Sequence, residues 1–260
     1  MKRIIFSIFS QLPTHERVTN YSSNQFKKYY DRLYESKDEY AKLCSAEFML
    51  LSPNEMSYID LQHYKIIMME KFAEEYDEVL YLDFDVIPMT NQNFFDVFDL
   101  NKICILNQNT NLIIQKEIEN YQYTEWQGDL SSSISNYKKY VIQKFQRDEY
   151  HRCSKAFAKR EMLFKDDIIS YDEHIVNTGI IAGNKKSISL LKYEERLDSM
   201  KLLSNLNNNE IFFSYLLERY NIPFTNIGDD WHRLYDELDT HLENSYMVHV
   251  INKQFEDVYG

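Results

Sequence analysis

The sequence predicts an α/β protein in which helices flank a mostly parallel central sheet. Short apolar runs alternate with longer segments of helical periodicity, an alternation typical of parallel sheets with helical crossovers. With 260 residues the chain can bury a large core. We therefore expect one domain, residues 1–260, interrupted by a segment of different composition at 109–165.

The first elements follow one another in regular order. An apolar run at 3–9 predicts the first strand, helical periodicity covers 24–47, and 48–51 predicts the second strand. A further helix is expected to begin at Asp60, because aspartate is a good N-cap residue. Lys65 lies on the apolar stripe of that helix, where a lysine either extends to the surface or reaches toward whatever binds near the strand ends.

The next strand ends in two aspartates. The apolar run at 79–82 leads directly into Asp83 and Asp85, which are two residues apart. Side chains alternate along a strand, so we expect both carboxylates to point to the same side of its carboxyl end. They repel each other unless a cation lies between them, and a divalent cation suits this edge of an open α/β sheet. The alternative is a pair of solvated turn residues.

The segment at 109–165 differs from the rest of the chain. It follows a predicted short helix at 94–98 and a strand at 103–106, and it is polar and rich in tyrosine. Helical pieces are expected within 134–162. Two interpretations stay open, a lid over the edge of the sheet and a solvated helical excursion.

The core pattern resumes after this segment. A strand is expected at 175–182, and Asn177, Thr178 and Gly179 lie inside it. A glycine within a strand indicates close approach by a ligand or by another backbone segment. One helix is expected over 186–203.

Composition excludes several classes of protein. The net charge of −12 disfavours nucleic acid as a partner, since phosphate backbones demand a basic surface. No run approaches the roughly 20 apolar residues of a membrane span, and the apolar part of the N-terminus is too short for a signal peptide. The three cysteines are far apart and odd in number, which fits a reducing compartment. We expect a cytoplasmic protein without a membrane span.

Glycine is scarce, with five residues in the whole chain. Neither the G-x-x-x-x-G-K-[ST] loop nor the G-x-G-x-x-G loop occurs. If a nucleotide binds, its phosphates must therefore be held by a metal ion and by side chains.

Several segments carry recognisable motifs in a fixed order. They are Tyr40-Ala41 with Phe48-Met49-Leu50, the D-x-D segment at 79–86, Asn177-Thr178-Gly179-Ile180, Asn209-Glu210-Ile211-Phe212, Trp231, and Met247-Val248-His249 within a predicted strand at 246–251. Together they resemble the motifs of GT-A fold glycosyltransferases of the galactosyltransferase-like and glycogenin-like families. The resemblance covers most of the chain outside 109–165. Two departures are that His232 replaces the asparagine of the family's W-N turn, and that Lys253 follows His249 without the family's glycine, proline and tryptophan.

The resemblance implies a Rossmann-like GT-A sheet and a metal-dependent glycosyltransferase. Such an enzyme moves a hexosyl or pentosyl group from a nucleotide-diphosphate sugar, with a UDP-sugar favoured, to a hydroxyl acceptor such as a glycan. The resemblance further implies that Asp83, Asp85 and His249 bind Mn²⁺ or Mg²⁺, and an imidazole ligand favours Mn²⁺. The segment at 109–165, which the resemblance does not cover, is a candidate acceptor-binding lid.

The resemblance assigns further residues to the donor. Those expected to border the nucleoside, the phosphates or the donor sugar are Ser7, Ile8, Phe9, Lys65, Asp83, Phe84, Asp85, Asn177, Thr178, Gly179 and Lys253. Within this set, Lys65 and Lys253 would neutralise phosphate oxygens.

Four residues are candidates for the catalytic polar group: Asp172, Glu173, Asn209 and Glu210. An inverting enzyme needs a carboxylate base to deprotonate the acceptor hydroxyl. A retaining enzyme needs only a polar group near the anomeric carbon, because the leaving phosphate can take the proton. The late histidine resembles that of retaining enzymes, so we expect retention.

Two other functions compete with this interpretation. A haloacid dehalogenase-like phosphatase would use Asp83 and Asp85 as nucleophile and acid/base, with Asp166-Asp167 as its later acidic motif. However, two strands precede the aspartates here, and Ile87-Pro88 stands where such enzymes carry threonine or valine. The other possibility is an inactive GT-A domain that binds sugar or acts as a scaffold.

Overall fold

The computed structural model describes residues 1–10, 19–53, 56–109, 147–170, 172, 174–200, 208–235 and 242–260. The chain divides into two compact units. The first comprises Met1–Leu106, Thr178–Asn207 and Ile222–Gly260, and the second comprises Asn107–Asn177 and Asn208–Asn221.

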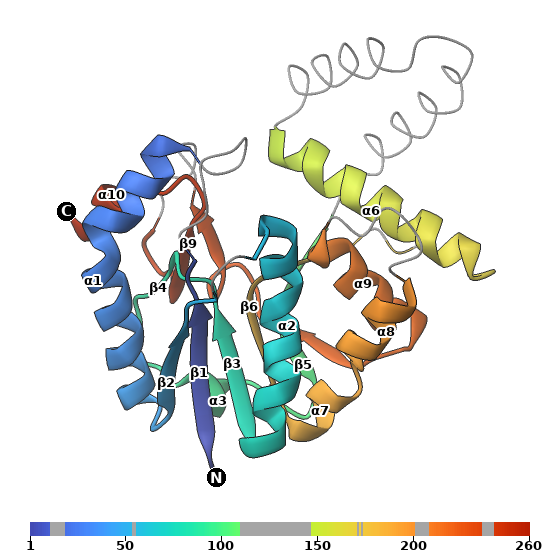
Figure 1. Ribbon diagram of the computed structural model, residues 1–260, viewed down its shortest axis with the longest axis horizontal. Helices are drawn as coiled ribbons and strands as arrows, with labels where there is room; N and C mark the ends of the chain where they lie inside the picture. The colour runs from blue at the N-terminus through green and yellow to red at the C-terminus, as the bar shows by residue number, and fades with distance from the viewer. Residues whose placement is uncertain are drawn as a thin grey trace. The chain divides into compact units, whose positions relative to one another are not determined.

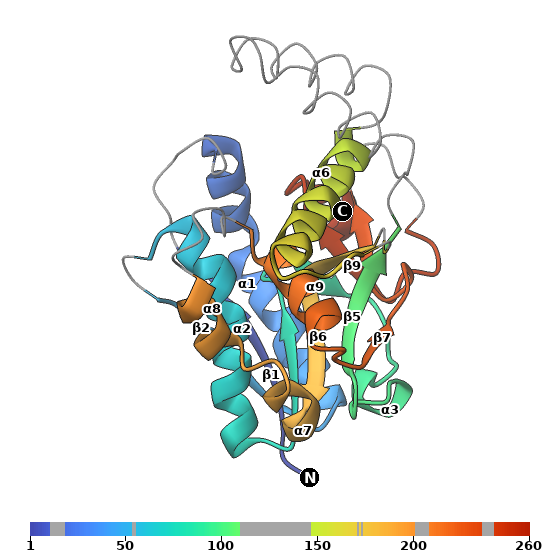
Figure 2. The same ribbon diagram turned by 90° about the vertical axis from the view of Figure 1, so that its right-hand side faces the viewer.

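A six-stranded sheet forms the centre of the fold, in the order β2-β1-β3-β6-β5-β7 (Figures 1 and 2). Its strands are β1 (Arg3–Ile8), β2 (Glu47–Leu51), β3 (Glu78–Leu82), β5 (Ile103–Gln108), β6 (Ile175–Asn184) and β7 (Phe224–Asn226). β1 runs parallel to both β2 and β3, and β5 runs parallel to β7. β6 is antiparallel to β3. The predicted mostly parallel α/β sheet is therefore confirmed, with β6 as its reversed strand.

Helices α1 (Asn20–Leu43) and α2 (Tyr58–Glu75) cover opposite faces of this sheet. Ile5 of β1 packs in one apolar cluster with Tyr40 of α1. The next residue, Phe6, points the other way and packs against Phe72 of α2, with 4.9 Å between ring centroids. Because both faces are covered, both sets of alternating side chains in the central strands must be apolar. This explains why the sequence shows continuous apolar runs there.

The local sequence sets the helix boundaries, with two differences from expectation. α2 has Ser57 as its N-cap, where Asp60 was expected, because the Ser57 hydroxyl oxygen accepts the backbone N–H of Asp60 at 3.1 Å. The single helix expected over 186–203 is two helices, α7 (Lys185–Ser189) and α8 (Tyr193–Met200). Between them Lys192 has a φ of 42°, which a continuous right-handed helix does not allow. The short helix α3 (Phe94–Val97) follows the prediction.

A small three-stranded sheet, in the order β4-β9-β8, carries the C-terminal histidine. It consists of β4 (Val86–Pro88), β8 (Arg233–Tyr235) and β9 (Met247–Val250), and helix α10 (Glu256–Tyr259) follows it. β4 is antiparallel to β9, with Val86 opposite His249. Because β4 begins directly after the D-x-D segment, this pairing brings His249 to the two aspartates.

The second unit contains helices α6 (Arg147–Lys165) and α9 (Asn209–Arg219). Lys159 of α6 is buried and links this helix to α9 and to Asp172. Its Nζ lies 3.0 Å from both the Asp172 and the Glu218 carboxylates. α6 is helical where helical pieces were expected, and residues 110–146 of the predicted insertion lie outside the described residues. Within the described part of the chain, no helix combines the length and apolar character needed to cross a membrane.

Candidate functional site

The D-x-D segment is a turn at the end of the central strand. β3 ends at Leu82, and the backbone N–H of Val86 donates to the Asp83 carbonyl at 2.9 Å. Neighbouring strands hold this turn, because Asp83 N–H donates to the Gly179 carbonyl at 2.8 Å and Val250 N–H donates to the Asp85 carbonyl at 3.0 Å. The two carboxylates therefore converge through a turn, where strand alternation had been expected to align them.

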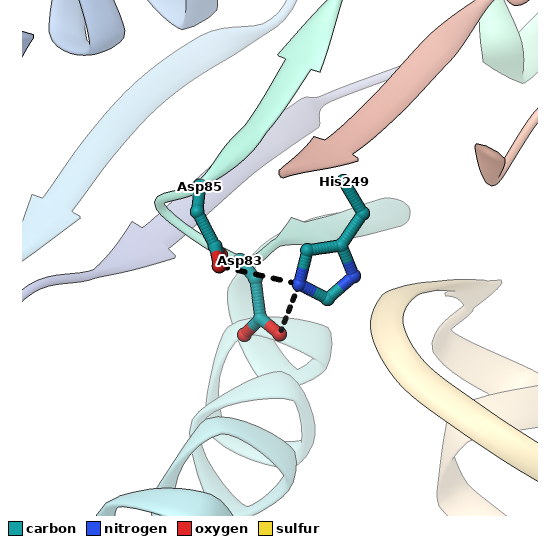
Figure 3. A group of neighbouring side chains, drawn as sticks. All are labelled: Asp83, Asp85 and His249. Atoms are coloured by element: carbon teal, nitrogen blue, oxygen red, sulfur yellow. Dashed lines mark ion pairs between the residues drawn. The ribbon is translucent and has the colours of Figure 1, made fainter. Parts of the chain in front are cut away.

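Asp83, Asp85 and His249 form a compact group of potential metal ligands (Figure 3). Each offers one ligand atom, and these atoms lie within 4.8 Å of one another. His249 Nε2 lies 3.3 Å from Asp85 Oδ2 and 3.8 Å from Asp83 Oδ2. Both of these imidazole–carboxylate distances are below about 4.2 Å, which is twice a metal–oxygen distance of about 2.1 Å and the greatest separation of two ligands of one such ion. Two carboxylates and an imidazole therefore suit a divalent cation.

Two lysines neutralise the carboxylates. Lys65 of α2 is buried and places its Nζ 3.2 Å from Asp83 Oδ1, and the Tyr81 hydroxyl donates to the same carboxylate. Lys253 pairs with Asp85. Burial opposes ionisation of Asp85, but Lys253 and His249 outweigh it and hold the pKa of Asp85 well below its ordinary value. The Asp85 carboxylate is thus negatively charged at neutral pH, as a metal ligand must be.

A second histidine lies behind the first. His232 is fully buried, and its Nε2 lies 3.1 Å from Nδ1 of His249, with the two rings stacked at an interplanar angle of 18°. Burial, and then the neighbouring His249 and Lys65, hold the pKa of His232 well below its ordinary value. The sequence predicts no role for His232, although its place in the W-N turn marks it as unusual.

Gly179 makes room for both rings. A Cβ atom at this position would lie 2.6 Å from Cε1 and Nδ1 of His249 and 2.9 Å from Nε2 of His232, closer than real contacts allow. The predicted close approach at Gly179 therefore exists. The approaching groups are imidazole rings, where the sequence suggested a ligand or a backbone segment.

A buried lysine that the sequence did not predict to be functional, Lys37, also supports the D-x-D turn. Its Nζ donates to the Phe84 carbonyl at 2.9 Å and to the Leu33 carbonyl at 3.1 Å. Burial lowers the pKa of Lys37 to about 7, although Asp85 and Asp83 act in the opposite direction. The available signal was its place on α1 between the apolar positions Leu33 and Tyr40.

The end of β1 lies beside the D-x-D turn. Phe9 contacts Phe84, with ring centroids 4.8 Å apart, and also contacts Phe26. Lys253 Nζ lies 5.7 Å from the centroid of the Phe26 ring. The buried Ser7 hydroxyl donates to the Leu82 carbonyl at 2.7 Å, so it links β1 to β3. Ile8 closes the strand.

The candidate catalytic residues belong to the second unit, whereas the metal-ligand group belongs to the first. Glu210 pairs with Lys155, and Asn209 is fully buried at the start of α9. Asp172 is half-buried, which opposes its ionisation, but His174 and Lys159 outweigh burial and lower its pKa. Asn177 also lies in this unit and the buried Thr178 in the first, while Glu173 lies outside the described residues.

Comparison of the sequence with known proteins finds no matching family model and no matching curated protein. Among solved structures, the chain is similar to a glycosyltransferase involved in glycosylation of the major capsid of PBCV-1, with a TM-score of 0.55, 14% identity and 100% of both chains covered. Mouse xyloside xylosyltransferase 1 gives a TM-score of 0.48 at 11% identity, covering 96% of this chain and 98% of that chain. At such low sequence identities the similarity concerns the fold alone. The assignment of the fold rests on the first of these structures, which has the higher TM-score. The chain has the GT-A glycosyltransferase fold, as its motifs predicted.

Proposed function

We propose that the protein is a metal-dependent glycosyltransferase. It transfers a hexosyl or pentosyl group from a nucleotide-diphosphate sugar, with a UDP-sugar favoured, to a hydroxyl of an acceptor, for which we propose a glycan. The observation that carries this proposal is the Asp83, Asp85 and His249 group, which lies at the end of a central strand in a GT-A fold.

The proposed metal is Mn²⁺ or Mg²⁺, held by the two carboxylates and by Nε2 of His249. Imidazole is a better ligand for Mn²⁺ than for Mg²⁺, so the histidine favours manganese. Such an ion, when bound, acts as a Lewis acid toward the diphosphate of the donor.

The residues around the metal-ligand group suit a nucleoside diphosphate. Lys65 and Lys253 each lie against one of the carboxylates, and these two positive charges beside the metal-ligand group support their proposed role toward phosphate oxygens. Phe9 and Phe84 form an aromatic contact at the end of β1, beside Ser7 and Ile8, and we assign this region to the nucleoside. Asn177, Thr178 and Gly179 complete the proposed donor set.

The proposed transfer retains anomeric configuration. An inverting enzyme needs a carboxylate that readily takes a proton. Asp172 is a poor base because its pKa is lowered, Glu210 is paired with Lys155, and the Asn209 amide is not a base. None of these three side chains is suited to proton abstraction. The catalytic assignment of these residues and of Glu173 stays a prediction. So does an acceptor-binding role for the segment at 109–165.

The GT-A fold does not favour the phosphatase alternative, although Asp83 and Asp85 are close together as that function would also require. A GT-A domain without activity stays distinct from the proposed enzyme in one measurable respect. It would bind a nucleotide with metal but would not release nucleoside diphosphate from a nucleotide sugar in the presence of an acceptor.

The first experiment is calorimetric titration with UDP and with GDP, each with and without Mn²⁺. We expect Mn²⁺-dependent binding of UDP to the wild type and its loss in Asp85→Asn. Asp99→Asn is the matched control, since Asp99 is exposed and lies outside the metal-ligand group. Turnover is then measured as release of UDP from a panel of UDP-sugars. Failure of UDP, GDP, CDP and dTDP to bind with metal would contradict the proposal.

A further inference from the structure

His232 is not one of the proposed metal ligands, but it contacts one of them, His249. His249 presents one ring nitrogen, Nε2, to Asp83 and Asp85, and it presents the other, Nδ1, to Nε2 of His232 at 3.1 Å. His232 itself makes no ion pair with either carboxylate among the described residues. Its hydrogen-bond contact with the metal-ligand group is the one to His249.

A single hydrogen can lie between the two facing nitrogens, and its position decides what Nε2 of His249 can do. If Nδ1 of His249 carries the hydrogen, His232 accepts it and the neutral His249 ring has a lone pair on Nε2. If His232 carries it, the neutral His249 ring has its own hydrogen on Nε2, facing the carboxylates. Only the first arrangement leaves Nε2 free to bind a metal ion.

We propose that His232 is the positioning residue that makes His249 a metal ligand, because it accepts the hydrogen of His249 Nδ1 and so directs the Nε2 lone pair toward Asp83 and Asp85. This inference rests on the proposed function. Ligand histidines usually donate their second N–H to a carboxylate, a backbone carbonyl or water. Here an uncharged imidazole takes that place.

The surrounding packing fixes this pair of rings. Gly179 lies against both, and any side chain there would overlap His249 at 2.6 Å and His232 at 2.9 Å. The same residue accepts the backbone N–H of Asp83 through its carbonyl. One position on β6 thus holds the D-x-D turn and leaves space for the stacked imidazoles.

Two forces act against the proposed direction of the hydrogen bond. Asp85, 3.3 Å from Nε2 of His249, attracts a hydrogen to that nitrogen. When His232 accepts at Nε2, its own hydrogen lies on Nδ1, a buried atom with no hydrogen-bond partner among the described residues. A buried unpaired donor costs about 1–3 kcal/mol. We therefore assign the proposed direction to the protein with its metal bound, because a cation held by Nε2 of His249 and the carboxylates would make a hydrogen on Nε2 unnecessary.

The test is a double-mutant cycle on Mn²⁺ binding. Free Mn²⁺ is followed by its electron paramagnetic resonance signal in titrations of the wild type, His232→Met, His249→Ala and the double variant. We expect His232→Met to weaken Mn²⁺ binding about 10- to 100-fold, the range known for outer partners of metal ligands. In the His249→Ala background the same change should alter binding less than about twofold, because sites that act through one another are not additive.

His232→Gln is the matched rescue variant. Its side-chain amide oxygen can accept a hydrogen bond near the position of the imidazole Nε2, whereas methionine has similar size and only a weak sulfur acceptor. We expect Gln to restore most of the affinity that Met loses. Urea unfolding of each variant confirms that it is folded before titration.

The outcomes separate this inference from the proposed function. Three results would overturn the inference about His232 and leave the proposed metal site standing. They are an equal loss of Mn²⁺ affinity in both backgrounds, no loss of Mn²⁺ affinity in His232→Met, and a Gln variant that binds Mn²⁺ as weakly as the Met variant. If the wild type itself fails to bind Mn²⁺, the proposed metal site fails and the inference fails with it.

Discussion

Lys65 Nζ lies 3.2 Å from Asp83 Oδ1, although the two residues come from different elements, the helix α2 and the turn after β3. Both side chains are largely shielded from water, Lys65 almost completely. A buried charge needs a partner, and here each supplies one for the other. The same contact places a fixed positive charge beside the proposed metal, where it disfavours a bare cation and favours a cation that carries a diphosphate.

Replacement of Lys65 should therefore affect nucleotide and metal in opposite directions. In Lys65→Gln we expect UDP to bind at least about tenfold more weakly in saturating Mn²⁺, since a charge-assisted hydrogen bond is worth about 1.5–3 kcal/mol. Mn²⁺ alone should bind as well as before or more tightly. Calorimetry measures both. Lys71→Gln, an exposed position on the same helix, is the control and should change neither.

Gly179 and Gly183 offer a matched pair on one strand. An added Cβ at Gly179 would lie 2.6 Å from His249, and one at Gly183 would lie 2.6 Å from the Ser187 hydroxyl oxygen. Both alanine variants should lose about 1–3 kcal/mol of unfolding free energy through overpacking. Gly179→Ala alone should also lose Mn²⁺ binding. Comparable Mn²⁺ affinity in the two variants would show that the space at Gly179 serves packing only.

Lys37 should make stability depend on pH. Its pKa is about 7 in the folded protein, below the ordinary lysine value of 10.5, because burial disfavours the charged form. Between these values the unfolded chain binds more protons than the folded one, so stability rises with pH. From pH 7 to pH 9 the wild type should gain up to roughly 1 kcal/mol per pH unit relative to Lys37→Met. Urea unfolding at several pH values measures this difference, and a difference that stays constant with pH would refute the prediction.

Asp172 provides a test of the retaining mechanism. A general base typically contributes about 10²- to 10⁴-fold to rate. We expect Asp172→Asn to slow transfer by less than about 100-fold, because its lowered pKa makes it a poor proton acceptor. Nuclear magnetic resonance of the product should show the anomeric configuration of the donor. An inverted product together with a loss above 1,000-fold, on the order expected for a true base, would instead identify Asp172 as the base.

Local patterns in the sequence determined the fold class and much of the candidate site. The apolar runs of β1 and β3 predict buried parallel strands, because a strand covered by helices on both faces needs apolar residues at every position. The spacing of Asp83 and Asp85 indicates a cation site by itself, whereas His249 joins them as a set only through the resemblance of the motifs to those of GT-A glycosyltransferases. Lys65 is recognisable in the sequence because it is a charged residue on the apolar stripe of a helix, where an uncharged residue is expected.

Only the tertiary structure decided the contacts that link distant segments. His232 and His249 meet because β8 and β9 pair in the small sheet, and Lys37 reaches the D-x-D turn because α1 packs over it. Lys253 and Asp85 pair across 168 residues of sequence. The periodicity of a sequence does not predict which lysine or histidine will lie beside a given carboxylate. The distances between these side chains depend on how whole helices and strands pack. The sequence by itself determined the apolar strands and the pair of aspartates that follows one of them, because these are local patterns, and the tertiary structure decided which lysines and histidines lie beside those aspartates, because that depends on the packing of distant elements.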